Sequence, residues 1–190
     1  IRTKWFYISS LAGNIGLLRA IVAFAKKNNI RIAYNPGGKE LAQKKGLLSL
    51  LKHIEVLLVN REEASLITDV SFENVEKLFS KWDTMSPGIN VMTDARNGAW
   101  ASDGARVYHA GIFKEKKMQD RTGAGDAFGS GFVSSLMYKP GDIERAIRLG
   151  SANATSKVEG MGAKYGLLTK KQFESDKRWR ALSITKKSLS

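Results

Sequence analysis

The sequence predicts an α/β fold, in which a layered and mainly parallel sheet carries helices on both faces. Short apolar segments rich in strand-forming residues alternate with longer segments of helical apolar spacing. Clusters of glycine, asparagine and proline separate them and mark turns. Because connections between successive parallel strands are right-handed, this alternation builds a sheet with helices packed on it. We expect a single α/β domain over residues 1–190.

The first strand–helix–strand unit is the clearest. Residues 5–8, Trp-Phe-Tyr-Ile, are strand formers. Residues 15–27 have helical apolar spacing, which Asn28-Asn29 ends. A second strand is expected at residues 30–34, closed by the turn residues Asn-Pro-Gly-Gly at 35–38.

The middle of the chain repeats this order, and a buried-looking apolar run is followed by an acid-rich helix start. The elements expected here are helices at about residues 39–45, 47–52, 61–64 and 72–81, and strands at 54–59 and 89–93. Ligands of such sheets bind beyond the carboxyl ends of the strands, so loops that follow these strands are candidates for a site.

The last part of the chain is mainly helical. A hairpin is expected from residues 98–102 and 106–109 around Asp103-Gly104. Helices should follow at about residues 125–138, 143–159 and 170–179. The polar, basic residues 184–190 are expected to be a loose tail.

Composition limits the classes of function. The chain has no cysteine, which excludes disulfides and thiolate zinc sites and fits a reducing compartment such as the cytoplasm. The net charge of +13 favours anionic partners in general. The basic residues are spread out, and no nucleic-acid module is visible, so nucleic acid is not the expected partner. The apolar run of residues 5–25 contains polar residues and turns, which argues against a membrane span.

Most of the residues that indicate a chemical function lie in one stretch of the sequence. Residues 120–128 read DRTGAGDAF, and an apolar helix follows. A helix start exposes backbone N–H groups and carries partial positive charge, so the small residues Gly123, Ala124 and Gly125 leave room for a phosphate. Asp126 in the first turn could take a proton from a hydroxyl. The alternative is an ordinary glycine-containing loop before a helix, and the chain has no Walker A motif.

This stretch closely resembles a signature of the ribokinase-like, or PfkB-type, carbohydrate kinases. Arg121 departs from the small residue usual in that signature. Other segments agree with the family in order and spacing, over about residues 5–173. They are IAYNPGGKELAQ, VLLVNREEASLIT, VMTDARNGAWASDG and SANATSKVEGMGAKYG.

The resemblance implies a kinase that transfers the γ-phosphoryl group of ATP to a hydroxyl of a sugar, nucleoside or related small molecule. It implies that Asp126 is the general base and that Gly123, Ala124 and Gly125 form the anion hole. Positioning and charge stabilisation do most of the catalysis in such a reaction.

The resemblance also implies a binding role for two polar residues. Asn60 and Glu63 match the element that organises Mg²⁺ and the phosphates, often through water. Their alternative is a helix cap with its capping-box partner.

Further residues match the nucleotide and cation sites of the family. Thr93 and Gly98 match the loop near the nucleotide, in which Ala95 stands where the family often has glycine. Asn153 is a candidate near the adenine, with a polar helix face as its alternative. The last matches are Asp120 and Thr122, which help to bind a monovalent cation in potassium-dependent members, and Gly162 in the closing loop.

The amino-terminal half of the family, with its glycine-rich substrate segment and β lid, has no counterpart here. We therefore expect a ribokinase-like, carboxy-terminal ATP-binding portion without that half. Two other functions stay open. One is a non-catalytic binding protein that uses its basic surface on nucleic acid or an acidic partner. The other is a subunit that completes its sheet with a separate chain or in a homodimer.

Overall fold

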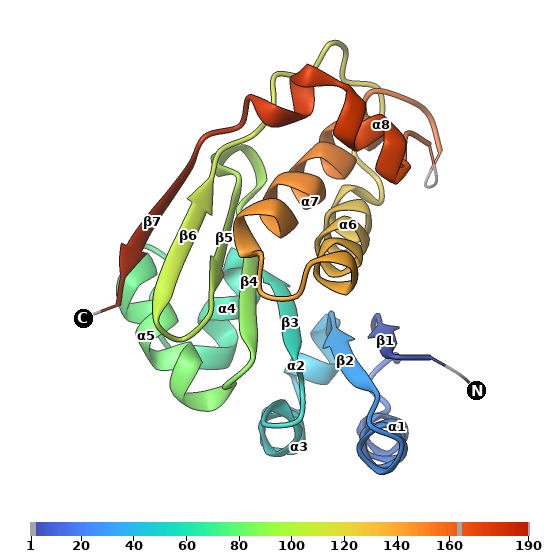
Figure 1. Ribbon diagram of the computed structural model, residues 1–190. Helices are drawn as coiled ribbons and strands as arrows, with labels where there is room; N and C mark the ends of the chain where they lie inside the picture. Colours follow the sequence, from blue (N-terminus) through green and yellow to red (C-terminus); the bar gives the residue numbers. More distant parts are fainter. Residues whose placement is uncertain (1–2, 163–164, 190) are drawn as a thin grey trace. The chain divides into compact units, whose positions relative to one another are not determined.

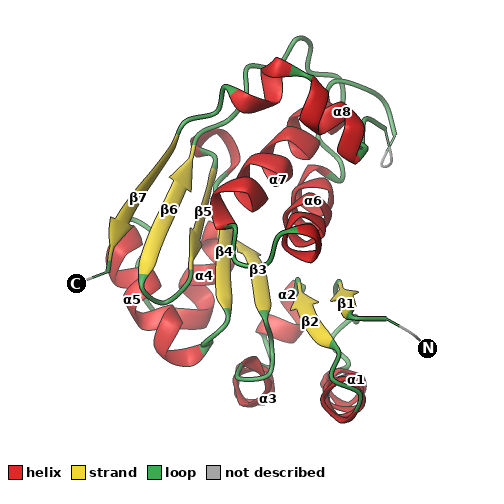
Figure 2. Cartoon of the chain, in the orientation of Figure 1, coloured by secondary structure: helices red, strands yellow, loops and turns green. Residues whose placement is uncertain are grey.

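The computed structural model describes residues 3–162 and 165–189 of the chain. The described strands form one seven-stranded sheet in the order β1-β2-β3-β4-β5-β6-β7 (Figure 1, Figure 2). The chain divides into two compact units. The first comprises Ile1–Thr93, Ala101–Val107 and Lys187–Ser190, and the second comprises Asp94–Trp100 and Tyr108–Lys186. The α/β class is confirmed, and a single domain over the whole chain stays a prediction.

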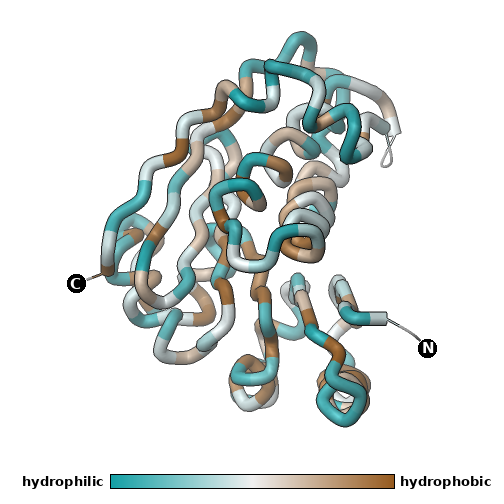
Figure 3. The backbone as a smooth tube through the Cα atoms, in the orientation of Figure 1, coloured by the Kyte–Doolittle hydropathy of each residue, from teal (hydrophilic) through white to brown (hydrophobic). Residues whose placement is uncertain are grey.

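The first unit is built on parallel strands. These are β1 (Trp5–Ile8), β2 (Arg31–Tyr34), β3 (Val56–Asn60) and β4 (Ile89–Thr93). Each pairs in parallel with the next one along the chain, so the expected strands are confirmed with small shifts at their ends. Residues Val56 to Val59 of β3 are all buried, and Figure 3 shows β3 largely in the hydrophobic colour. A strand buried on both faces needs such a continuous apolar run.

The helices of the first unit follow from the strand order. They are α1 (Ile15–Lys27), α2 (Gly38–Leu41), α3 (Lys44–Leu51), α4 (Arg61–Thr68) and α5 (Val75–Met85). Since the order β1 to β4 never reverses, right-handed crossovers place the connecting helices on one face of these strands. Phe79 and Trp82 of α5 are fully buried and stack with their ring centroids 5.5 Å apart.

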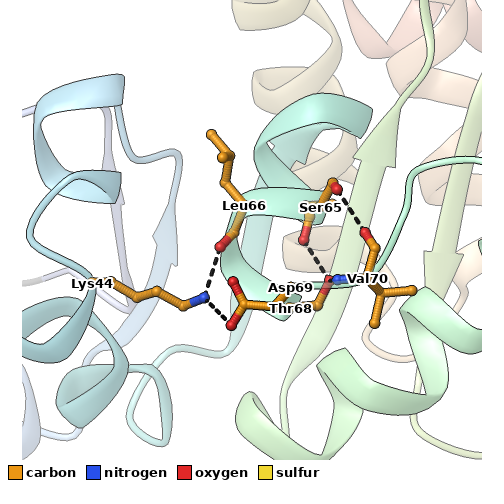
Figure 4. A network of polar contacts seen from close by, with 7 residues as sticks. Lys44, Ser65, Leu66, Thr68, Asp69 and Val70 are labelled. Atoms are coloured by element: carbon orange, nitrogen blue, oxygen red, sulfur yellow. Dashed lines mark hydrogen bonds and ion pairs between the residues drawn. The ribbon is translucent and has the colours of Figure 1, made fainter.

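The carboxyl end of α4 is held by a lysine from α3. Asp69 ends the helix in the left-handed conformation, with φ of 56°. Lys44 Nζ donates to the Leu66 carbonyl at 2.9 Å and pairs with Asp69 Oδ2 at 2.6 Å (Figure 4). An ammonium at this place satisfies a helix-end carbonyl and matches the negative end of the helix dipole. The contact ties α3 to α4.

Two helices dominate the second unit, α6 (Ala124–Tyr138) and α7 (Ile143–Val158). They pack closely because glycines stand where the helices meet. A Cβ atom at Gly131 would lie 3.0 Å from the Leu149 carbonyl oxygen, and one at Gly150 would lie 3.0 Å from the Phe128 carbonyl oxygen. Within residues 3–162 and 165–189, no helix combines the length and the apolar character needed to cross a membrane.

The predicted hairpin is present as β5 (Ala99–Ser102) and β6 (Arg106–Ala110), which are neighbours in the sheet. The short connection between them requires an antiparallel pair. Asp103 Oδ1 accepts hydrogen bonds from the N–H groups of Ala105 at 2.9 Å and Arg106 at 2.7 Å. This aspartate therefore sets the turn.

The expectation of a loose carboxy-terminal tail is wrong. Residues Ile184–Ser188 form β7, next to β6, and the Leu189 N–H donates to the Ala105 carbonyl at 3.0 Å. Figure 3 shows β7 mostly in the hydrophilic colour, and its lysines are exposed. Edge strands often carry lysine and are held by backbone pairing, so they lack the apolar pattern that identifies inner strands.

The last expected helix is divided. Helix α8 covers Lys170–Ser175, and a separate 3-10 turn covers Lys177–Arg180. Asp176 between them has extended backbone angles, and its carboxylate accepts a hydrogen bond from the Arg178 N–H at 2.9 Å. The aspartate therefore ends one helix and caps the next turn.

Candidate functional site

The start of α6 is open to an anion. Gly123 precedes the helix with φ of 80°, a conformation that suits glycine. The Ala124 N–H donates to the Arg121 carbonyl at 3.1 Å. Among the described residues, none accepts a hydrogen bond from the N–H groups of Gly125 or Asp126. A Cβ atom at Gly125 would meet nothing within 4 Å, so an approaching anion would find space.

Asp126 lies in the first turn of α6, and its side chain is exposed. No group in the described part of the chain pairs with its carboxylate. It is therefore not used as a structural ion pair, and it remains available to accept a proton or to approach a ligand at the helix start. Its role as the general base stays a prediction.

Asp120 is engaged in a different way. Its Oδ1 accepts a hydrogen bond from the Thr122 N–H at 2.8 Å, and its Oδ2 lies 3.2 Å from Lys157 Nζ. The Thr122 N–H, then the Thr122 hydroxyl, and then the Lys157 ammonium lower the pKa of the Asp120 carboxyl to about 2. Lys157 was missed in the sequence, although its place within the apolar pattern of a helix signalled burial.

Asn153 of α7 is buried. Its Oδ1 accepts a hydrogen bond from the Leu168 N–H at 2.9 Å, and its Nδ2 would lie 2.7 Å from a Cβ atom at Gly131. The side chain thus joins α7 to the segment before α8, and a place near an adenine stays a prediction. Gly162 has φ of 92° and is exposed. The neighbouring Ala163 and Lys164, part of the closing loop, lie outside the described residues.

In the first unit, Asn60 and Glu63 form a capping box at the start of α4. Asn60 Oδ1 accepts a hydrogen bond from the Glu63 N–H at 2.8 Å, and Glu63 Oε2 accepts one from the Asn60 N–H at 2.8 Å. This is the alternative that the sequence left open. Burial raises the pKa of the Glu63 carboxyl, against the lowering effect of the Asn60 N–H. The role with Mg²⁺ stays a prediction.

The loop after β4 requires unusual backbone angles. Thr93 ends β4 in the first unit, and the following residues belong to the second unit. Ala95 has φ of 44° and Gly98 has φ of 90°. A Cβ atom at Gly98 would lie 1.9 Å from the Ala110 carbonyl oxygen, so only glycine fits there. Ala95 adopts left-handed backbone although it has a side chain.

A buried carboxylate, missed in the sequence, fixes two loops at the carboxyl ends of β1 and β2. Glu40 is fully buried and accepts hydrogen bonds from the N–H groups of Leu11 at 2.5 Å, Gly13 at 3.0 Å and Gly37 at 3.0 Å. The Ser10 hydroxyl donates to it at 3.1 Å. Burial opposes ionisation, but hydrogen bonds from the N–H groups of Gly13, Leu11 and Glu40 and from the Ser10 hydroxyl together lower the pKa of the Glu40 carboxyl.

The predicted site residues thus fall into two groups. The second unit brings together Asp120, Thr122 and the start of α6, whereas the first unit pairs Asn60 with Glu63. Among residues 3–162 and 165–189, no three His, Asp or Glu side chains gather as a metal site. A divalent ion at Glu63 would therefore take most of its ligands from phosphate and water.

A protein-family model and curated relatives match most of this chain. The family model described as pfkB family carbohydrate kinase matches residues 6–170. A ribokinase from Haemophilus influenzae is 29% identical over 153 residues, which are 78% of this chain and 47% of the relative. A nucleoside kinase from Methanocaldococcus jannaschii is 26% identical over 144 residues, 75% of this chain and 45% of the relative. The chain spans about half the length of the curated relatives it matches.

A solved structure supports the same fold. A ribokinase II from E. coli, crystallised in complex with ATP and Mg²⁺, superposes with a TM-score of 0.73 and 19% sequence identity. The match covers 87% of this chain and 55% of that chain. At this identity, the likeness shows the fold.

Proposed function

The chain belongs to the pfkB family of carbohydrate kinases, and on that premise we propose that it transfers the γ-phosphoryl group of ATP to a hydroxyl of a small molecule. The acceptor class is a sugar or a nucleoside, since relatives are a ribokinase and a nucleoside kinase. The observation that carries the proposal is the open start of α6, where an unpaired aspartate stands beside N–H groups with no acceptor among the described residues.

In this proposal Asp126 is the general base. Its exposed carboxylate takes the proton of the acceptor hydroxyl as that oxygen attacks the γ-phosphorus. The N–H groups of Gly125 and Asp126 stabilise the charge on the transferred group, and Gly123 keeps side-chain bulk away. Ala124 contributes less than the sequence predicted, because its N–H already donates to the Arg121 carbonyl.

For ATP and Mg²⁺ we propose binding roles for Asn60, Glu63 and Thr93 of the first unit and for Gly98 and Asn153 of the second unit. Mg²⁺ supplies charge neutralisation at the phosphates when it is bound. The donor set suits this ion, because Glu63 offers one carboxylate whose Oε1 no described residue engages, and Mg²⁺ commonly keeps several waters. The capping box holds the Glu63 side chain in one orientation, which would favour a water-mediated contact.

The test combines binding and turnover in one pair of variants. Calorimetry with ATP and Mg²⁺ should detect binding, and a panel of sugars and nucleosides should reveal a phosphorylated product. Asp126→Asn should lower turnover by about 10²- to 10⁴-fold and leave ATP affinity unchanged. Glu73→Gln removes an exposed carboxylate elsewhere and serves as the control. Wild-type turnover in Asp126→Asn would overturn the assignment of the base.

A second candidate function rests on the net charge of +13. In that case the chain is a non-catalytic member that binds nucleic acid or another polyanion through its basic surface. Binding to random-sequence DNA with a steep dependence on salt, together with no calorimetric ATP signal, would favour this function over the kinase.

A further inference from the structure

A buried ammonium lies beside the turn that leads into α6. Lys157 of α7 has a relative exposure of 0%. Its Nζ donates to the Asp120 main-chain carbonyl at 3.0 Å and to Asp120 Oδ2 at 3.2 Å. Lysine is rarely buried completely unless its charge is paired. The surroundings of the Lys157 ammonium are therefore suited to a positively charged group.

The turn is ordered by a short series of contacts that begins at this ammonium. The second carboxylate oxygen of Asp120 accepts the Thr122 N–H at 2.8 Å. The Arg121 carbonyl then accepts the Ala124 N–H at 3.1 Å, and Gly123 completes the turn in the left-handed conformation. The position of the open N–H groups of α6 therefore depends on the orientation of Asp120.

The oxygen atoms of Asp120 do not fit a bound potassium ion. The resemblance assigned Asp120 and Thr122 to a monovalent cation, and such an ion is held by oxygen atoms that replace its water. Here the Asp120 main-chain oxygen and Oδ2 both face the Lys157 ammonium, and Oδ1 faces an N–H group. An ion placed on the same oxygens would be repelled by the ammonium.

We propose that the Lys157 ammonium is a built-in cation that takes the place of a potassium ion beside the turn into α6. Lys157 is then a positioning residue, because it acts on the reacting groups through Asp120 and the turn. The chain needs no monovalent cation at this place. The catalytic part of this inference rests on the proposed kinase function, whereas the cation part concerns the fold alone.

The first experiment measures thermal stability, which needs no nucleotide. Wild type, Lys157→Ala and the control Lys186→Ala are melted in potassium chloride and in tetramethylammonium chloride at equal ionic strength. Lys186 makes an exposed ion pair with Glu144, so its loss removes one lysine charge without touching the turn. Wild type and the control should melt at the same temperature in both salts. Lys157→Ala should melt lower in tetramethylammonium, and potassium should restore it in a saturable way.

The second experiment measures turnover under the same conditions. The turnover of wild type should not change with potassium, whereas that of Lys157→Ala should rise with potassium by about 10- to 100-fold. Effects of this size are typical of residues that orient the groups of a site without touching the ligand. A residue with a merely structural role would show no such selective rescue. If wild type has no turnover in any salt, the proposed function fails, but the melting comparison still decides the inference.

Three results would overturn the inference. One is a saturable rise in the melting temperature of wild type with potassium. The second is a Lys157→Ala variant whose melting temperature is equally low in both salts. Should Lys157→Ala not fold in tetramethylammonium, recovery of folding in potassium supports the inference, and failure in both salts counts against it.

Discussion

Substitution of Gly98 by alanine should destabilise the protein through a backbone clash. Gly98 follows the 3-10 turn Ala95–Asn97 and has φ of 90° and ψ of −134°. An added Cβ atom would lie 1.9 Å from the Ala110 carbonyl oxygen and 2.8 Å from Gly111 Cα. Both atoms belong to the main chain, so no rotation of a side chain can relieve the contact. The loop and the strand beside it must move apart.

The magnitude follows from a matched pair of glycines. Gly104 also has a positive φ, 83°, but a Cβ atom there would meet nothing within 4 Å. Gly104→Ala should therefore lose only the cost of left-handed backbone, about 1–2 kcal/mol. Gly98→Ala should lose at least that cost, because ψ of −134° lies outside the left-handed helical region, and in addition an overpacking cost of about 1–3 kcal/mol. The difference between the two variants therefore reports the clash together with the added strain of this ψ.

Urea denaturation measures both variants against wild type. The midpoint should fall further for Gly98→Ala than for Gly104→Ala, with unchanged slopes of free energy against urea. Equal midpoints in the two variants would refute the argument, because they would mean that the loop absorbs the added atom without cost.

Three further predictions concern carboxylates and backbone strain. Glu40→Gln should lower the free energy of unfolding by about 3 kcal/mol, measured in urea. Because the folded pKa of Glu40 is lowered, its stabilisation exists above its ordinary pKa of 4.5 and is lost as pH falls, so the variant should lose less stability in acid than wild type. Glu63→Gln should keep the capping box, and urea stability within about 0.5 kcal/mol of wild type, while calorimetry shows weaker Mg²⁺-dependent ATP binding. Ala95→Gly should raise the free energy of unfolding by about 0.5–1 kcal/mol, since φ of 44° strains alanine.

The inner strands were predictable because the physics that builds them is local. A run such as Val56 to Val59 is apolar at every position, and the turn residues after Tyr34 mark where a strand must stop. Strand β7 was not predicted, because its own residues do not show that it pairs with β6. An edge strand with lysines looks like a solvated tail until its neighbour is known.

The candidate site was predictable only in part, for a similar reason. The open start of α6 follows from small residues beside Asp126, which are adjacent in the sequence. Glu40 and Lys157 were missed because their hydrogen-bond partners are distant in the sequence. Glu40 accepts a hydrogen bond from Leu11, and Lys157 donates one to Asp120. A lone charged residue in a helix usually faces water, and even where the apolar pattern signals burial, as at Lys157, only the three-dimensional structure shows the group that pairs with it.

Both missed residues solve the same physical problem. A loop at the end of a parallel strand or before a helix has few backbone hydrogen bonds of its own, yet a binding site needs its backbone fixed. Glu40 accepts hydrogen bonds from N–H groups of two loops, and Lys157 donates hydrogen bonds to oxygen atoms of one turn. Hydrogen bonds to a charged group are stronger than neutral ones, so one buried charge can fix several backbone groups. Both side chains are buried, so removal of either charge should change the geometry of the backbone that it holds while the exposed residues of that segment stay the same.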